Sequence, residues 1–148
     1  MYDTILVPLD GSRRAERILA HVVPLAHHFG ARIVLLRVVE PDLNLAQSTG
    51  TPAEFYAQMF ERAEEDAASY LAGIQGELRA SGLQVRTLIE RGPVARTIIE
   101  VAAREAADLV AMASHGRSGL KRAFYGSVAA GVLRRVDRPL LVIRADEE

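Results

Sequence analysis

A run of small, polar and cationic residues around position 115 has the residue types and spacing that favour chemistry. It reads Ala113-Ser114-His115-Gly116-Arg117-Ser118-Gly119 and continues to Tyr125-Gly126-Ser127-Val128. An apolar segment precedes it and a helical pattern follows it, so it joins the end of a strand to the start of a helix. Backbone N–H groups at a helix start favour anions, and glycines let a ligand approach the backbone closely. The pattern predicts a phosphate cradle, although turns and helix caps explain it equally well.

Asp10 is the second residue with a candidate role. It ends the apolar run Ile5-Leu6-Val7-Pro8-Leu9, which is typical of a buried strand followed by a turn. Ligands of open α/β sheets bind at the carboxyl ends of strands, where the strand order reverses. If the first and fourth strands flank that point, Asp10 lies beside Met112 and Ala113. It then accepts a hydrogen bond from a ribose hydroxyl or binds a phosphate-bound cation, whereas an Asx-turn into the first helix is the structural alternative.

Several familiar catalytic and cofactor signatures are missing from the sequence. There is no G-x-x-x-x-G-K-[ST] motif, no G-x-G, no H-E-x-x-H and no cysteine. We therefore predict no catalytic residue and no protein-held metal. His115 is the only credible general base for a water molecule. His21 is expected near the buried edge of the first helix, with a structural hydrogen bond.

Apolar runs alternate with helical patterns along the whole chain. Strands are expected at residues 5–9, 33–39, 84–89, 108–113 and 139–144, and helices at 13–29, 52–78, 93–106 and 127–135. This alternation predicts an α/β fold, a single doubly wound domain over residues 1–148, with a five-stranded parallel sheet and helices on both faces. The continuous apolar run at 33–36 indicates a strand buried on both sides, and the alternation at 84–89 favours a sheet edge.

The bulk composition excludes some classes of partner. The 148 residues carry a net charge of −1, with 49% hydrophobic and 25% charged residues. Such a chain has no electrostatic reason to bind nucleic acid or acidic membranes. No apolar run reaches membrane-spanning length, and the first residues do not form a signal peptide. We predict a cytoplasmic protein.

Four segments together resemble the universal stress protein family. Gly116, a nine-residue spacer and Gly126-Ser127 are similar to the second half of its ATP-binding signature, G-x-x-G, nine residues, then G-S or G-T. The opening residues 5–12, the strand Leu35-Leu36-Arg37-Val38-Val39 and the closing residues 138–143 are also similar to this family. The resemblance spans the chain. It implies the sheet order 3-2-1-4-5 and a homodimer paired through the last strand, Leu140 to Ile143.

The resemblance also implies which residues bind ATP. Adenine and ribose are expected at Pro8, Leu9, Asp10, Val38 and Met112. The phosphates are expected along Gly116, Gly126, Ser127 and Val128, with Ala113, His115 and Arg117 nearby and Mg²⁺ or Mn²⁺ held through the phosphates. The implied function is that of a stress-response regulatory protein, a dimeric module whose ATP occupancy alters the binding of a protein partner.

Two alternative functions remain at this point. Ala113 stands where the first motif glycine is expected, which favours a family member that binds no nucleotide and serves as a dimeric protein-interaction module. Leu9 and Ala129 also replace residues that are often hydroxylated in ATP binders. A slow ATP hydrolase is the third hypothesis. Electron-transfer flavoproteins share this sheet order, but they are larger, and this chain has few aromatic residues for a flavin pocket.

Overall fold

The computed structural model describes residues 1–40, 53–115 and 126–145, which fold around one parallel sheet. The sheet has five strands in the order β3-β2-β1-β4-β5, and every neighbouring pair is parallel. This confirms the predicted fold class and strand order. The strands are β1 (Thr4–Pro8), β2 (Arg32–Val39), β3 (Val85–Arg91), β4 (Leu109–His115) and β5 (Leu140–Ala145). β3 and β5 lie at the two edges, as the alternating pattern of residues 84–89 predicts for β3 and the family resemblance implies for β5.

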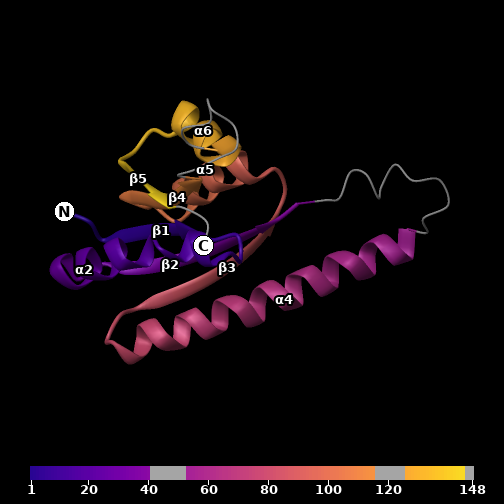
Figure 1. Ribbon diagram of the computed structural model, residues 1–148, viewed down its shortest axis with the longest axis horizontal. Helices are drawn as coiled ribbons and strands as arrows, with labels where there is room; N and C mark the ends of the chain where they lie inside the picture. The colour runs from indigo at the N-terminus through magenta and orange to yellow at the C-terminus, as the bar shows by residue number, and fades with distance from the viewer. Residues whose placement is uncertain (41–52, 116–125, 146–148) are drawn as a thin grey trace.

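Helices cover both faces of this sheet (Figure 1). They are α1 (Arg13–Glu16), α2 (Leu19–Phe29), α4 (Ala53–Ala80), α5 (Val94–Arg104) and α6 (Gly126–Arg135). The side chains of β1 and β2 alternate between the two faces. Ile5, Val7, Ile33 and Leu35 pack toward α2 and α4, and Leu6, Val34 and Leu36 pack toward α5 and α6. Both faces of β2 are buried, as its apolar run predicts.

The first helical segment differs from its prediction. The sequence predicts one helix from the Ser12 cap to Gly30, but the structure divides it into α1 and α2. Ser12 Oγ does cap α1, accepting a hydrogen bond from Ala15 N–H at 3.1 Å. The N–H groups of Arg17 and Ile18 then bond to carbonyls three residues back, which tightens the turn and breaks the α-helical pattern. His21 is exposed on α2, so its predicted place at the buried edge is wrong.

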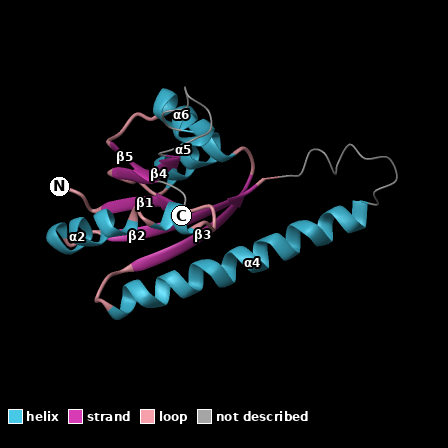
Figure 2. Ribbon diagram, in the orientation of Figure 1, coloured by secondary structure: helices cyan, strands magenta, loops and turns pink. Residues whose placement is uncertain are grey.

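The long helix α4 packs on the sheet over only part of its length. Ala67, Leu71, Ile74 and Leu78, in its second half, are buried beneath β2 and β3. The first half extends past the end of the sheet in Figures 1 and 2. Phe55 and Met59 belong to the same apolar stripe but are 48% and 39% exposed. The apolar stripe in the sequence therefore predicts the helix correctly, but it overstates how much of the helix packs against the sheet. No helix of the described residues combines the length and apolar character that crossing a membrane requires.

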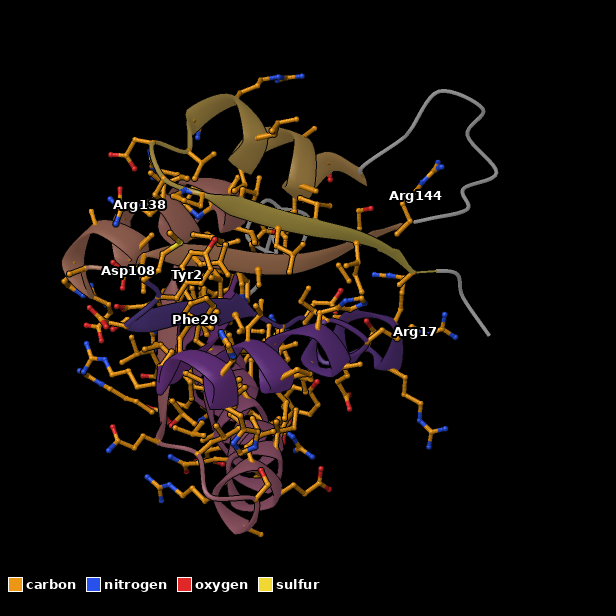
Figure 3. All side chains as sticks on the ribbon, turned by 90° about the vertical axis from the view of Figure 1, so that its left-hand side faces the viewer. Tyr2, Arg17, Phe29, Asp108, Arg138 and Arg144 are labelled. Atoms are coloured by element: carbon orange, nitrogen blue, oxygen red, sulfur yellow. The ribbon has the colours of Figure 1, made fainter. Side chains whose placement is uncertain are left out.

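The amino-terminal end of the sheet is fastened by side chains that bind the backbone. Asp108 Oδ2 accepts hydrogen bonds from the N–H groups of Asp3 and Thr4 at 2.8 and 2.9 Å. Arg138 Nη1 donates to two buried carbonyls, those of Ala102 and Ala107, at 2.9 Å each. Figure 3 shows Asp108 and Arg138 at one end of the sheet and Arg144 at the other. Tyr2 and Phe29, labelled at the first end, meet edge to face at 5.1 Å.

Candidate functional site

A crevice opens at the other end of the sheet, between β1 and β4. Their pairing runs only from Ile5 opposite Leu109 to Leu6 opposite Val110. Both strands continue beyond it, β1 to Pro8 and β4 to His115. The strand order reverses here, because β2 and β3 lie to one side of β1 while β4 and β5 lie to the other. This is the place where open α/β sheets bind ligands.

The crevice holds a cavity of about 680 Å³, part of it open to solvent. Its walls come from the carboxyl ends of three strands and the amino ends of three helices. The lining residues are Pro8, Leu9 and Asp10 after β1; Arg14 and Ala15 of α1; Leu36, Arg37 and Val38 of β2; Val94 and Ile98 of α5; Met112, Ala113 and Ser114 of β4; and Gly126, Ser127, Val128 and Ala129 of α6.

One side of the cavity is apolar and rigid. Leu36, Val38, Ile98 and Met112 belong to the core cluster under α5 and α6 and are buried. Val94 packs against the same cluster at the start of α5. Because these side chains are fixed by core packing, they form a preformed apolar surface. Such a surface suits a flat or hydrophobic group of a ligand.

The charged groups of the cavity are organised around Asp10. Its Oδ1 accepts hydrogen bonds from Ser12 N–H at 2.9 Å and Ser12 Oγ at 2.6 Å, which is the predicted Asx-turn. Its Oδ2 accepts one from Arg14 Nη2 at 3.2 Å. Burial acts to raise the pKa of Asp10. The two bonds from Ser12 and the charges of Arg14 and Arg37 outweigh it and lower the pKa below its usual value. Asp10 is therefore an ionised acceptor at neutral pH.

Arg37 and Tyr70 extend this charged group toward α4. Arg37 Nη1 donates a hydrogen bond to the carbonyl oxygen of Val38 at 2.5 Å. Tyr70, in the packed half of α4, donates its hydroxyl to Glu16 Oε2 at 2.9 Å. Burial, the bond to Glu16 and the nearby negative charges of Glu16 and Asp10 raise the pKa of Tyr70, while Arg37 acts to lower it. Tyr70 therefore stays neutral, and its hydroxyl donates to the Glu16 carboxylate.

The start of α6 forms the opposite wall. Gly126 is the first residue of this helix and has φ +74°, a conformation that other residues rarely adopt. Ser127 is exposed, and Ala129 is buried against the core. The first turn of a helix presents N–H groups without intrahelical partners and a partial positive charge. This wall therefore favours an anionic group of the ligand.

The cavity collects every predicted site residue whose side chain the structure describes. Pro8, Leu9, Asp10, Val38, Met112, Ala113, Gly126, Ser127 and Val128 all line it. Asp10 therefore lines the same cavity as Met112 and Ala113. His115 ends β4, and its side chain is not among those described. Gly116 and Arg117 lie outside the described residues.

Sequence reasoning missed two arginines and the α5 wall. Arg14 lies four residues after Asp10, at the spacing of ion pairs on a helix, and this spacing is the signal that finds it. Arg37 is the one charged residue in the expected strand 33–39, close to its carboxyl end, where ligands bind. Val94 and Ile98 have only an apolar helical pattern, which does not distinguish a cavity wall from ordinary core.

Ala113, where a motif glycine is expected, fits the strand without strain. It pairs with Ile143 of β5 in regular parallel register. Its side chain packs against the core cluster under α2 and α4. The extra methyl group is therefore accommodated within the fold.

Comparison with known proteins gives a consistent result over the full length of the fold. The family model described as "Universal stress protein family" matches residues 1–144. The universal stress protein MJ0577 of Methanocaldococcus jannaschii is 29% identical over 155 residues, covering 97% of this chain and 96% of that protein. Its solved structure superimposes with a TM-score of 0.85 and covers 100% of this chain and 99% of its own.

Two further solved structures share the fold and contain adenine nucleotides. One is a universal stress protein in complex with cAMP, with 20% identity, a TM-score of 0.69 and coverage of 97% of this chain and 98% of that one. The other is a universal stress protein from Archaeoglobus fulgidus in complex with dAMP, with 20% identity, a TM-score of 0.67 and the same coverage of both chains. With the family model matched across nearly all of its residues, the chain belongs to the universal stress protein family.

Proposed function

We propose that this protein is a stress-response regulator that binds ATP in the crevice between β1 and β4. The observation that carries the proposal is the lining of the cavity. An apolar wall, an ionised carboxylate and a helix start surround one space. Adenine needs the first, a ribose hydroxyl the second and phosphates the third. The cAMP and dAMP complexes of two proteins with this fold are consistent with an adenine nucleotide.

The cation of the proposed complex is held by the phosphates rather than by the protein. Both carboxylate oxygens of Asp10 already accept hydrogen bonds, Oδ1 from Ser12 and Oδ2 from Arg14. The remaining lone pairs suit a hydroxyl donor better than a divalent cation, which needs several oxygen ligands. Among the described residues no group of three or more acidic or histidine side chains is placed to hold a metal ion. Mg²⁺ or Mn²⁺ therefore enters the proposal as part of the nucleotide.

Calorimetric titration of nucleotide-stripped protein with ATP, with and without Mg²⁺, tests the site. We expect about one ATP per chain with micromolar affinity, which needs about −8 kcal/mol. Gly126→Val should abolish binding, because a β-branched residue is strained at φ +74° and fills the phosphate wall. Gly76→Ala is the matched control, since Gly76 lies in α4 and a Cβ there meets nothing within 4 Å.

The result also separates the alternative functions. No ATP binding by folded wild-type protein would refute the proposal and favour the nucleotide-free interaction module. ADP appearing in the stored ATP complex would instead reveal the slow hydrolase. Because Gly126→Val can disturb the start of α6, Ser127→Ala serves as a second variant and should weaken binding without changing the melting temperature.

We also propose a homodimer formed by antiparallel pairing of β5 with β5 of a second chain. β5 is an edge strand, and its residues Leu140 to Ile143 are only half-buried. Val110 N–H donates to Pro139 C=O, so Pro139, Leu141 and Ile143 direct their backbone groups toward β4. Leu140 and Val142 direct theirs outward. An exposed apolar edge of this kind favours strand pairing between chains.

Val142→Pro tests the dimer without removing a hydrogen bond inside the sheet, because the lost N–H faces outward. Sedimentation equilibrium should show a dimer for the wild type and a monomer for Val142→Pro, and Val142→Thr should remain dimeric. A wild-type monomer would contradict the dimer but would leave the ATP proposal intact.

A further inference from the structure

The first half of α4 carries an apolar surface that the sheet does not cover. This half extends past the strands in Figures 1 and 2, and Phe55 and Met59 are exposed on it. A hollow that is open to solvent lies between this half of α4 and the end of β2. Its lining residues are Val39, Glu40, Tyr56, Met59, Phe60 and Ala63. We call Phe55 and these six residues the α4 surface. An exposed apolar surface with a polar rim is typical of an interaction site.

Contacts between side chains hold this surface in one shape. Tyr56 and Phe60 meet edge to face, with their ring centroids 5.2 Å apart. Arg91, the last residue of β3, places its guanidinium carbon 4.7 Å from the centroid of the Phe60 ring and forms an ion pair with Glu64. β3 thereby fastens α4 near the place where its packing on the sheet ends. A partner would meet an ordered surface, and this lowers the entropic cost of binding.

Carboxylates outnumber cationic groups around the α4 surface. Residues 53–66 contain one basic side chain, Arg62, and five acidic ones, Glu54, Glu61, Glu64, Glu65 and Asp66. Arg91 pairs with Glu64, but Glu40, in the hollow itself, forms no ion pair within the described part of the chain. The whole chain has a net charge of −1, so this excess of negative charge is local. The complementary surface of a partner is therefore positively charged.

The same charges disfavour two other occupants. A second copy of the chain that paired its own α4 surface with this one would bring the acidic side chains of both copies to one interface, where like charges repel. An acidic membrane would be repelled in the same way. A basic amphipathic helix avoids this cost, because it can place its apolar face on Phe55 and Met59 while its cationic side chains meet the carboxylates at the rim.

We infer that the α4 surface is the docking site for a basic amphipathic helix of a protein partner. The apolar side chains of that helix enter the hollow and cover Phe55 and Met59, and its lysine and arginine side chains pair with Glu40 and the acidic side chains of α4. The site is separate from the nucleotide cavity, and the two share no lining residue. The inference therefore goes beyond ATP binding and does not depend on it.

Fluorescence anisotropy with two labelled peptides tests the inference in nucleotide-free protein. Both peptides carry leucine at helical spacing on one face, and the remaining positions are lysine in one peptide and glutamate in the other. The wild type should bind the lysine peptide at least about tenfold more tightly than the glutamate peptide. Phe55→Ser and Met59→Ser should each weaken binding of the lysine peptide about tenfold, because each removes an apolar anchor. Leu133→Ser is the matched control, since Leu133 is an exposed apolar residue of α6, and it should leave the affinity unchanged.

A charge variant separates complementarity from general hydrophobic binding. Glu40→Gln should weaken binding of the lysine peptide about threefold and reduce the salt dependence of its Kd. Glu77→Gln, at an exposed position in the other half of α4, is the matched control and should change neither quantity. The substituted side chains lie at the surface, so the melting temperatures should match that of the wild type.

Several results would overturn the inference. Equal affinities for the two peptides would remove the charge complementarity, and unchanged affinity in both Phe55→Ser and Met59→Ser would place the binding elsewhere. A wild-type oligomer that Phe55→Ser dissociates and Val142→Pro does not would identify a second copy of the chain as the occupant. Binding to vesicles of phosphatidylcholine and phosphatidylserine that Phe55→Ser abolishes would identify a membrane instead. Failure of the folded protein to bind ATP would refute the proposed function alone, because the peptide titrations contain no nucleotide.

Discussion

The two ends of the sheet use the same kinds of side chain in opposite ways. At the amino-terminal end, Asp108 and Arg138 bind backbone groups of the chain itself, the N–H groups of Asp3 and Thr4 and the carbonyls of Ala102 and Ala107. At the carboxyl-terminal end, Asp10 pairs with Arg14 and Ser12 around a cavity. The charged side chains at the first end bind the backbone of the chain itself, whereas those at the second end line an open cavity.

The difference follows from where the strands stop. β1 and β4 begin together and remain paired at Ile5 and Leu6, so the backbone at the amino-terminal end is close enough for one side chain to bridge two segments. They separate toward the other end, where no side chain has to complete the pairing. Stability and binding therefore depend on different residues, and substitutions at one end should leave the other property unchanged.

Arg138→Ala should have the largest effect on stability. It removes two charge-assisted hydrogen bonds to buried carbonyls, and we expect the free energy of unfolding to fall by about 3 kcal/mol. Urea denaturation measures this loss, and ATP titration should show an unchanged Kd. Arg134→Ala, at an exposed position of α6, is the control and should change neither quantity. A loss of ATP affinity in folded Arg138→Ala would show that the two ends are coupled.

Asp108→Ala should have the next largest effect. The carboxylate accepts bonds from two N–H groups at the start of β1, and its loss should lower the free energy of unfolding by about 2 kcal/mol. Asp108→Asn keeps one acceptor oxygen and should recover about half of this loss. Hydrogen exchange of the Thr4 amide is the local measurement. Equal protection in wild type and Asp108→Ala would contradict the role of this carboxylate.

The architecture could be predicted from the sequence because it depends on repeated patterns. The alternation of apolar runs and helical stripes indicates the strands and the parallel sheet, and the strand at 33–36 is buried on both sides as its residues require. The order of the strands and the place of Val38 follow from the family resemblance, whereas the places of Pro8 and Gly126 follow from the strand ends and the glycine-rich loop. All three line the cavity in the structure.

The features that the sequence does not predict depend on single side chains, because the pattern of apolar and polar residues does not determine where one side chain points. Arg37 belongs to the face of β2 under α4, yet its guanidinium reaches round to the Val38 carbonyl. The pairing of β1 with β2 ends at Pro8 opposite Leu36, so the Val38 carbonyl lies beyond it, and the sequence does not place this end precisely. The sequence also does not predict that the first half of α4 is exposed. Helical periodicity identifies the apolar face of the helix, but it does not tell how far the sheet extends beneath that face.

Two glycine substitutions outside the residues that line the cavity should have smaller effects of opposite sign. Gly76→Ala in α4 should raise the free energy of unfolding by about 0.7 kcal/mol, because Ala favours the helix and a Cβ meets nothing within 4 Å. Gly92→Ala should lower it, since Gly92 has φ +141° and a Cβ would lie 2.9 Å from Thr97 Oγ1. Thermal unfolding measures both. A stabilised Gly92→Ala would show that this turn relaxes without cost.

The smallest expected effect is the pH-dependent contribution of Asp10 to stability. Its pKa is lowered in the folded state, so its contribution is present above the unfolded value and disappears as the pH falls through the folded value. Its side chain is 54% exposed, and solvent screens the pair with Arg14. The wild type should therefore exceed Asp10→Asn by less than about 1 kcal/mol at neutral pH, and the difference should shrink below about pH 4. Urea denaturation at several pH values measures it. A difference that persists in acid would show that the Asx-turn, rather than the charge, stabilises the wild type. Asp10 would then be free to serve the ligand at almost no cost to the fold.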